Sequence, residues 1–159
     1  MGGLFHSIPM MVSVAPKVAE SFKNGGGVKF NEYGEDGVDA ISIMNEGTYK
    51  KRLGSYWIKS MPDIFEKLTS GCDILDFGCG TGRSAVELAK RFKKSTFFGF
   101  DKFKPNIEEA KINAKSGDVT ANTYFQVWDA DEGGPDDKYD IAGAFDLIHD
   151  LPHPQEGIK

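Results

Sequence analysis

The most constraining feature of this 159-residue chain is a glycine-rich turn between a short apolar strand and a helix. Residues 73–82 read Asp-Ile-Leu-Asp-Phe-Gly-Cys-Gly-Thr-Gly, and apolar residues at helical spacing follow over 83–92. Glycines let the main chain approach a ligand closely, and the helix N-terminus behind them presents unpaired N–H groups with a partial positive charge. The unit therefore predicts a site where the backbone binds an anionic group such as a carboxylate or phosphate.

The spacing of the three glycines narrows the choice of ligand. A dinucleotide fingerprint requires a glycine one position later than Gly82, where this chain has Arg83. The carboxylate of Asp76, two residues before Gly78, would repel a phosphate and suits a ligand that carries a cation. These residues disfavour a nicotinamide-dependent oxidoreductase. An ordinary glycine-rich turn without a ligand is the alternative that the spacing leaves open.

The pattern D-x-G-C-G-x-G resembles motif I of the class I S-adenosylmethionine-dependent methyltransferases. The resemblance implies an α/β fold with a Rossmann-like parallel sheet. It also implies that the acidic residue and the loop hold the methionine part of S-adenosylmethionine, whose ammonium and sulfonium groups are positive. The candidate cofactor-binding residues in this loop are Asp76, Gly78, Cys79, Gly80 and Gly82.

Two later apolar stretches also end in acidic residues. The first, over 95–101, ends in Asp101, about 20 residues beyond the loop, where such folds place an acid that accepts hydrogen bonds from ribose. Asp101 and the adjacent Lys102 are therefore candidate cofactor-binding residues, although Asp101 would also serve as the cap of the following helix. The second stretch, over 120–130, ends in Asp129 and Ala130. The resemblance implies that these two residues contact the adenine ring of the cofactor.

The fourth unit, residues 139–154, contains the pattern F-D-x-x-H-D-x-x-x-P. It is similar to a methyltransferase subgroup in which a winged-helix-like domain precedes the cofactor domain, and the resemblance places Phe145 beside the cofactor. His149 and Asp150 follow the expected strand end, where α/β sheets place their sites, so they are candidate catalytic residues. Local packing of His149 is an equal alternative. Prolines break the spacing that a metal site would need, so no metal is expected.

The alternation of strands and helices after Cys72 predicts a parallel sheet of about four strands over 72–159. Before it, residues 1–71 are expected to form a helical linker or lid that includes a short helix over 15–22. A complete sheet of the resembled family has seven strands, so the C-terminal part of the fold is expected to be missing. A second copy or another chain would then cover the exposed edge of the sheet.

The overall composition bears on which partners and which location to expect. A net charge of −5 and scattered lysines give no support to a nucleic-acid partner. No apolar stretch is long enough to span a membrane. Cys72 and Cys79 flank one strand and are too far apart to bridge, which favours reduced thiols and a cytoplasmic location.

The sequence thus favours an S-adenosylmethionine-dependent methyltransferase domain that acts on an unidentified small-molecule acceptor. The second hypothesis is a non-catalytic module that binds S-adenosylmethionine or serves in assembly, because the chain resembles only part of the family's fold. Cofactor binding without turnover would favour this second hypothesis.

Overall fold

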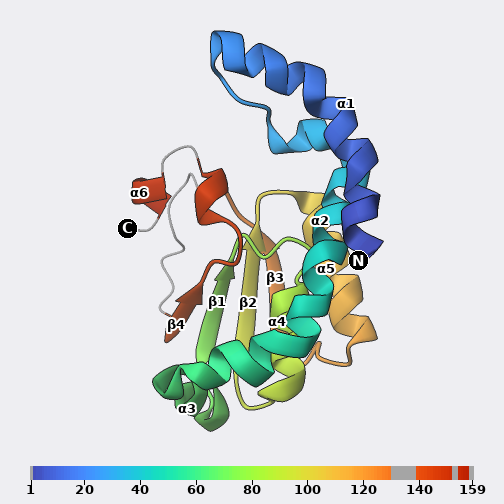
Figure 1. Ribbon diagram of the computed structural model, residues 1–159. Coiled ribbons are helices and arrows are strands. Elements are labelled where there is room, and N and C mark those ends of the chain that lie inside the picture. The colour runs from blue at the N-terminus through green and yellow to red at the C-terminus, as the bar shows by residue number, and fades with distance from the viewer. Residues whose placement is uncertain (1, 130–138, 152–153, 158–159) are drawn as a thin grey trace. The chain divides into compact units, whose positions relative to one another are not determined.

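The computed structural model describes residues 2–129, 139–151 and 154–157 (Figure 1). The chain divides into two compact units, residues 1–48 and 49–159. Each unit is described below by itself. The lid role expected of residues 1–71 stays a prediction.

The first unit consists of helices. Helix α1 (Gly2–Asn24) is longer than the expected 15–22 because Met10 and Val14, which lie before or at the edge of that range, are buried in the unit. The helix ends before Gly25, the first of three glycines with positive φ. A short 3-10 helix, η1 (Phe30–Tyr33), and helix α2 (Gly34–Thr48) complete the unit.

The second unit is built on a parallel sheet of four strands, as predicted. The strands are β1 (Asp73–Phe77), β2 (Thr96–Asp101), β3 (Thr123–Val127) and β4 (Ile141–Gly143), in the spatial order β3-β2-β1-β4. In the register of the sheet, Leu75 lies opposite Phe98 on one side and Ala142 on the other. Because β1 is central, the loop that follows it lies between the ends of two neighbouring strands.

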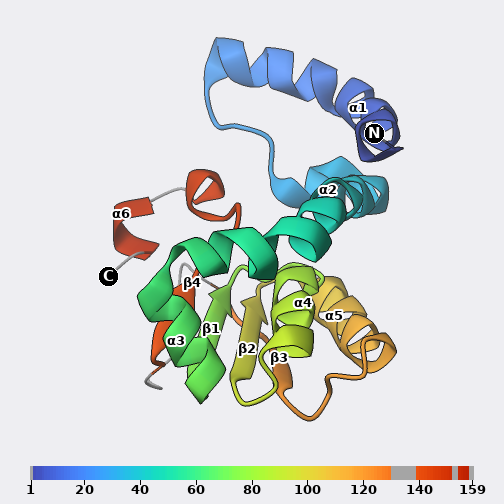
Figure 2. The ribbon, with the colours of Figure 1, turned by 60° about the horizontal axis from the view of Figure 1, so that its bottom comes forward.

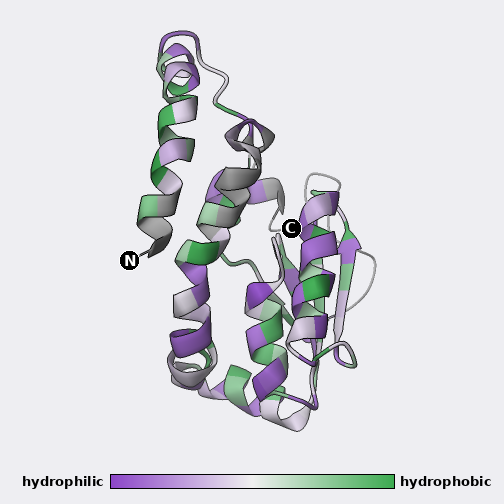
Figure 3. Ribbon diagram, turned by 90° about the vertical axis from the view of Figure 1, so that its right-hand side faces the viewer, coloured by the Kyte–Doolittle hydropathy of each residue, from purple (hydrophilic) through white to green (hydrophobic). Residues whose placement is uncertain are grey.

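Helices α3 (Pro62–Ser70), α4 (Arg83–Arg91) and α5 (Lys104–Ser116) lie on the same face of the sheet (Figures 1 and 2). A π-helix, η2 (Tyr49–Trp57), and a 3-10 turn, η3 (Ile58–Ser60), lead into α3, and η2 packs against α4. The helical ribbons alternate between polar and apolar residues (Figure 3), as expected for helices that bury one side. Phe97 and Leu53 are fully buried in this core.

The opposite face of the sheet carries aromatic side chains. The rings of Phe98 and Tyr124 stack with their centroids 5.3 Å apart, and Tyr139 lies 5.2 Å from Phe98. Tyr124 remains 54% exposed. After β4, the chain continues through a 3-10 turn, η5 (Ile148–Asp150), and the short helix α6 (Pro154–Gly157).

Candidate active site

The glycine loop joins β1 to α4 and is hydrogen-bonded to the end of the neighbouring strand β2. The backbone N–H groups of Gly78 and Cys79 both donate to the carbonyl oxygen of Phe100, at 2.8 and 2.9 Å. Gly78, Gly80 and Gly82 all have positive φ, between 53° and 71°, which side-chain-bearing residues rarely adopt. The sequence therefore needs glycine at these three positions to make this turn.

The three glycines differ in what surrounds them. A Cβ atom at Gly78 would lie 2.6 Å from a methyl group of Leu147, and one at Gly82 would lie 2.7 Å from the ring of Phe125. Both positions are thus closed by packing within the protein. A Cβ atom at Gly80 would meet nothing within 4 Å. Gly80 is therefore the position where the main chain faces open space and a ligand can approach it.

Asp76, near the end of β1, is a buried carboxyl with one unused acceptor. Its side chain is 3% exposed, and its Oδ2 accepts a hydrogen bond of 2.5 Å from the hydroxyl of Ser84, in the first turn of α4. Among the described residues, Oδ1 is buried and has no hydrogen-bond partner. Burial raises the pKa of Asp76 to about 7, the hydrogen bond from Ser84 opposes this rise, and the charge of Asp101 adds to it. A donor or cation from a ligand would satisfy this carboxyl.

Asp101, at the end of β2, connects the glycine loop to the start of α5. Its Oδ2 accepts from the N–H of Gly80 at 2.9 Å. Its Oδ1 accepts from the N–H of Phe103 at 2.9 Å and from the Asn106 side-chain amide at 3.1 Å. Burial raises the pKa of Asp101, and these three hydrogen bonds act in the opposite direction. The N-cap of α5 is Phe103, so Asp101 does not cap the helix as the sequence allowed; it instead accepts from the N–H of that residue and from a side chain in the first turn. The neighbouring Lys102 is exposed.

Tyr49 joins this neighbourhood from η2, and nothing in the sequence pattern predicted it. Its ring makes an edge-to-face contact with Phe145, with the centroids 6.0 Å apart. Burial raises the pKa of Tyr49 to about 12, and the charges of Asp146 and Asp76 add to the effect. Phe145 and Asp76 also line one small cavity of about 40 Å³. Phe145, a predicted cofactor-binding residue, therefore lies close to Asp76.

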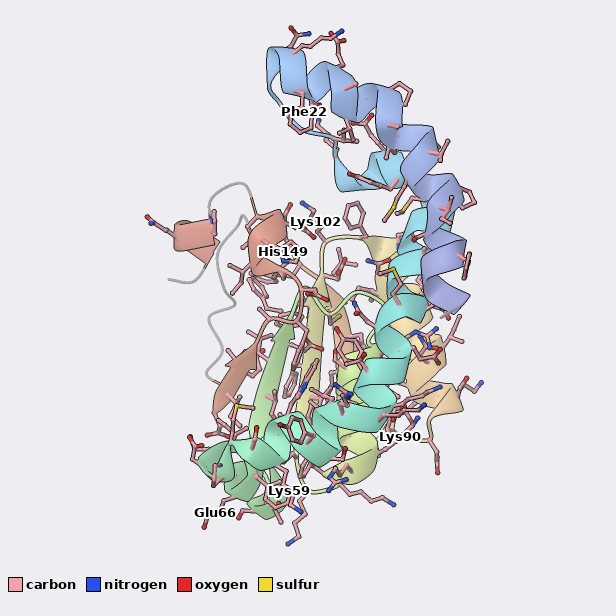
Figure 4. The ribbon with its side chains drawn as sticks, viewed as in Figure 1. Phe22, Lys59, Glu66, Lys90, Lys102 and His149 are labelled. Atoms are coloured by element: carbon pink, nitrogen blue, oxygen red, sulfur yellow. The ribbon has the colours of Figure 1, made fainter. Side chains whose placement is uncertain are left out.

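The two candidate catalytic residues lie on η5 and are open to solvent. His149 Nε2 is 3.6 Å from Asp150 Oδ1, and their side chains are 68% and 59% exposed. Figure 4 shows His149 and Lys102 at the end of the sheet where the strands lead into the loops. The packing of Leu147 against Gly78 brings this segment next to the glycine loop. His149 is thus exposed to solvent on a segment that packs beside the glycine loop through Leu147, and its catalytic role stays a prediction.

The remaining predicted site residues have simpler surroundings. Cys79 is buried, which raises the pKa of its thiol, and the thiol donates a weak hydrogen bond to the carbonyl oxygen of Gly80 at 3.6 Å. Asp129 is half-buried just after β3, and Ala130 lies outside the described residues. Cys72 and Cys79 are both free thiols, as expected.

Neither a metal site nor a membrane-spanning helix is found in the described part of the chain. No three His, Cys, Asp or Glu side chains there come together as metal ligands would. None of the helices described above is both long and apolar enough to cross a membrane.

A family model described as a methyltransferase domain matches residues 68–159. The 27-O-demethylrifamycin SV methyltransferase of Amycolatopsis mediterranei is 26% identical over 137 residues, which cover 77% of this chain and 50% of that protein. The chain spans half the length or less of the curated relatives that it matches.

Two solved structures have the same fold. The mitomycin 7-O-methyltransferase MmcR aligns with a TM-score of 0.65 and 15% identity over 95% of this chain and 45% of that one. The cyclase SpnF aligns with a TM-score of 0.52 and 18% identity over 76% of this chain and 53% of that one. The family match covers the glycine loop, the buried carboxyl and all four strands, and by it this chain belongs to the methyltransferase domain family.

Proposed function

We propose that this chain binds S-adenosylmethionine and takes part in methyl transfer to a small-molecule acceptor. The observation that carries the proposal is the pairing of two features at the end of β1. Asp76 offers a buried acceptor with no partner among the described residues, and Gly80 offers open backbone beside it. A ligand with a cationic group, such as the methionine part of the cofactor, matches the acceptor of Asp76, and the open space at Gly80 leaves room for the rest of that part, although the N–H of Gly80 itself donates to Asp101.

The other candidate residues are proposed to bind the remaining parts of the cofactor. Asp101 retains acceptor capacity beyond its three hydrogen bonds, because a carboxylate offers about four acceptor sites, so it can also bind a ribose hydroxyl. Phe145 flanks the methionine part together with Tyr49. The proposed assignment is methionine to Asp76, Gly78, Cys79, Gly80 and Gly82; ribose to Asp101 and Lys102; and adenine to Asp129 and Ala130.

When bound, S-adenosylmethionine supplies a methyl group already activated by its sulfonium sulfur. The protein then has to orient the acceptor in line with that methyl group and exclude water. If the acceptor is a hydroxyl, its proton must leave, and the exposed imidazole of His149 can accept it. Asp150, 3.6 Å away, would stabilise the imidazolium that forms.

The direct test is calorimetric titration of the 159-residue chain with S-adenosylmethionine, with NAD as the control. Saturable binding of S-adenosylmethionine alone supports the proposal. A folded protein that binds neither ligand, or binds only NAD, contradicts it. The exposed Lys59 provides a matched control variant, because Figure 4 shows it at the end of the sheet opposite to Lys102 and His149, so Lys59→Ala should leave the binding unchanged.

The second candidate function is a module that binds the cofactor without turnover. The observation that favours it is the exposure of both His149 and Asp150, since general bases usually act in a site from which water is excluded. The fold also allows other chemistry, because SpnF is a cyclase by name. Turnover that falls in His149→Ala while cofactor binding persists would support methyl transfer. Binding without turnover on any acceptor would support the module.

We also propose that the chain belongs to the subgroup with a winged-helix-like domain, on the pattern over 145–154. The free thiols of Cys72 and Cys79 support a reducing, cytoplasmic location. Within the described sheet, β4 pairs with β1 on one side, so its other edge is proposed to be covered by a second copy. A monomeric mass by light scattering at all concentrations would contradict that assembly.

A further inference from the structure

The positive charges of the chain are concentrated in its middle part. Residues 49–94 hold ten of the 19 Lys and Arg residues but only five of the 24 Asp and Glu residues. This stretch therefore carries a net charge of +5, whereas the remainder of the chain carries −10. The lysines are thus less scattered than the overall charge of −5 suggests, and an acidic protein contains one basic segment.

The π-helix η2 carries cations and aromatic rings on its outer side. Hydrogen bonds of a π-helix join residues five apart, so such residues lie about one turn apart on nearly the same side. Leu53 and Ile58, which begins η3, are five apart and are both buried in the core. Two further pairs at this spacing are exposed, and each combines a cation with an aromatic ring: Lys51 with Tyr56, and Arg52 with Trp57. No acidic residue occurs over 49–62.

The end of α4 and the turn after it extend this surface. Arg91 lies against η2, because a Cβ atom at Gly54 would be 2.8 Å from the Arg91 side chain. Lys94 lies beside the end of α3, because a Cβ atom at Gly71 would be 2.9 Å from its carbonyl oxygen. We define the basic face as the six exposed cations of these segments: Lys51, Arg52, Lys59, Arg91, Lys93 and Lys94.

Large apolar side chains are exposed beside these cations. Tyr56 is 67% exposed, Met61 41% and Trp57 36%. Tyr and Trp favour the headgroup region of a membrane, where the ring meets an apolar layer and the polar tip meets water. Clusters of four to eight Lys and Arg residues attract anionic lipid headgroups. The six cations exceed the two exposed acids of α3, Asp63 and Glu66, so the surface combines both features.

A single-stranded nucleic acid is the other polyanion that binds cations beside aromatic rings. It stacks its bases on ring faces, and the exposed thioether of Met61 offers no such face. A flexible polyanion longer than the basic face would also meet the remainder of the chain, which carries −10. A flat anionic surface touches the basic face alone and accepts an apolar side chain, so the observations favour lipid.

We propose that the basic face docks this protein on an anionic lipid surface, with Tyr56 and Trp57 in the headgroup region. The binding is peripheral and reversible, because no segment enters the hydrocarbon core. Figure 4 shows Lys59 at the end of the sheet opposite to His149, so the docked protein would keep the glycine loop open to water. The inference is independent of what that loop binds.

The first test is sedimentation of the whole chain with lipid vesicles. At low salt the chain should sediment with vesicles of equal parts phosphatidylcholine and phosphatidylserine, and remain in solution with phosphatidylcholine alone. Salt at about 0.5 M should release it, because screening weakens the attraction between exposed charges. A second readout uses Trp128→Phe, which leaves Trp57 as the single tryptophan of the chain. The emission of Trp57 should shift to the blue on the mixed vesicles.

Three variants separate charge from ring insertion. Lys51→Glu combined with Arg52→Glu should weaken vesicle binding about thirtyfold or more, because each cation near an anionic surface contributes about 1 kcal/mol. Lys111→Glu combined with Lys115→Glu is the matched control, because both lysines are exposed on α5 and the change in net charge is the same. This control should bind nearly as the parent chain does. Tyr56→Ser should weaken binding at unchanged charge.

Each outcome supports or overturns the docking. Equal sedimentation with both kinds of vesicle, or an equal loss of binding in the α5 control, overturns the basic face as the docking surface. Vesicle-bound protein with unshifted Trp57 emission overturns the insertion of the rings. A uridine oligonucleotide that binds more tightly than the vesicles, and is lost in the Lys51 and Arg52 double variant, assigns the face to nucleic acid and overturns lipid. If that double variant does not fold, the salt release and the Trp57 shift still decide.

Discussion

Replacing Asp76 with asparagine should stabilise the ligand-free protein at alkaline pH. The side chain is 3% exposed, and its burial raises the carboxyl pKa from an ordinary 3.8 to about 7. Asparagine has nearly the same shape, carries no charge and can still accept the hydrogen bond from Ser84 through its amide oxygen. The substitution therefore removes the cost of burying a charge and leaves the packing in place.

The magnitude follows from the difference between the folded and unfolded pKa values. The pKa is raised on folding, so between about pH 4 and pH 7 the native state binds more protons than the unfolded state, and stability falls as the pH rises. Above pH 7 the loss is complete. Three pKa units at about 1.4 kcal/mol each give about 4 kcal/mol, which is the gain expected for Asp76→Asn at pH 8. Near pH 4 the gain should be close to zero.

The assay is urea unfolding of the two ligand-free proteins at pH 4 and pH 8, followed by tryptophan fluorescence. Both pH values avoid the isoelectric point near 5.2. Glu66→Gln on α3 is a matched control, because Glu66 is an exposed acid and its substitution should change the free energy of unfolding little at either pH. A stabilisation of equal size at both pH values, or a loss of stability at pH 8, would refute the argument from burial.

Three further substitutions test the loop and its anchor. Gly82→Val should lower the free energy of unfolding by about 3 kcal/mol or more, as measured in urea, because its Cβ would lie 2.7 Å from the ring of Phe125 at a positive φ. Gly80→Val should cost only about 1–2 kcal/mol of backbone strain but abolish cofactor binding in calorimetry, and retained binding would count against the loop as the site. Asp101→Ala should weaken cofactor binding about tenfold or more by the same method, because hydrogen bonds to a charged group contribute about 1.5–3 kcal/mol. An unchanged affinity would show that Asp101 does not bind the cofactor.

The sequence predicted most of the second unit because its signals are local. Strand–glycine–helix alternation identifies β1, the loop and α4 without any knowledge of the fold, and the parallel sheet follows from the repetition of that unit. Helix α1 was predicted too short. Burial of residues such as Met10 stabilises its N-terminal half, and no capping signal in the sequence marks where this half begins. The π-helical form of η2 also has no signature in its residues.

The site was predictable only where spacing along the chain determines proximity. Asp76 and the glycines belong to one short pattern, whereas Ser84 and Asn106 reach the two carboxylates only after the helices dock on the sheet. The different surroundings of Gly80 and Gly82 likewise arise from tertiary packing. Tyr49 comes from a segment with no chemical motif, so its contact with Phe145 required the structure.

The hydrogen bonds of Asp101 have a consequence for the local motions of the protein. One carboxylate holds the amides of Gly80 and Phe103, which belong to two successive strand–helix connections. Neither connection can open far without releasing a bond to the same side chain, so both should open as one cooperative unit. Their amide hydrogens should then exchange with solvent at matching rates, and those rates should separate when the shared carboxylate is removed.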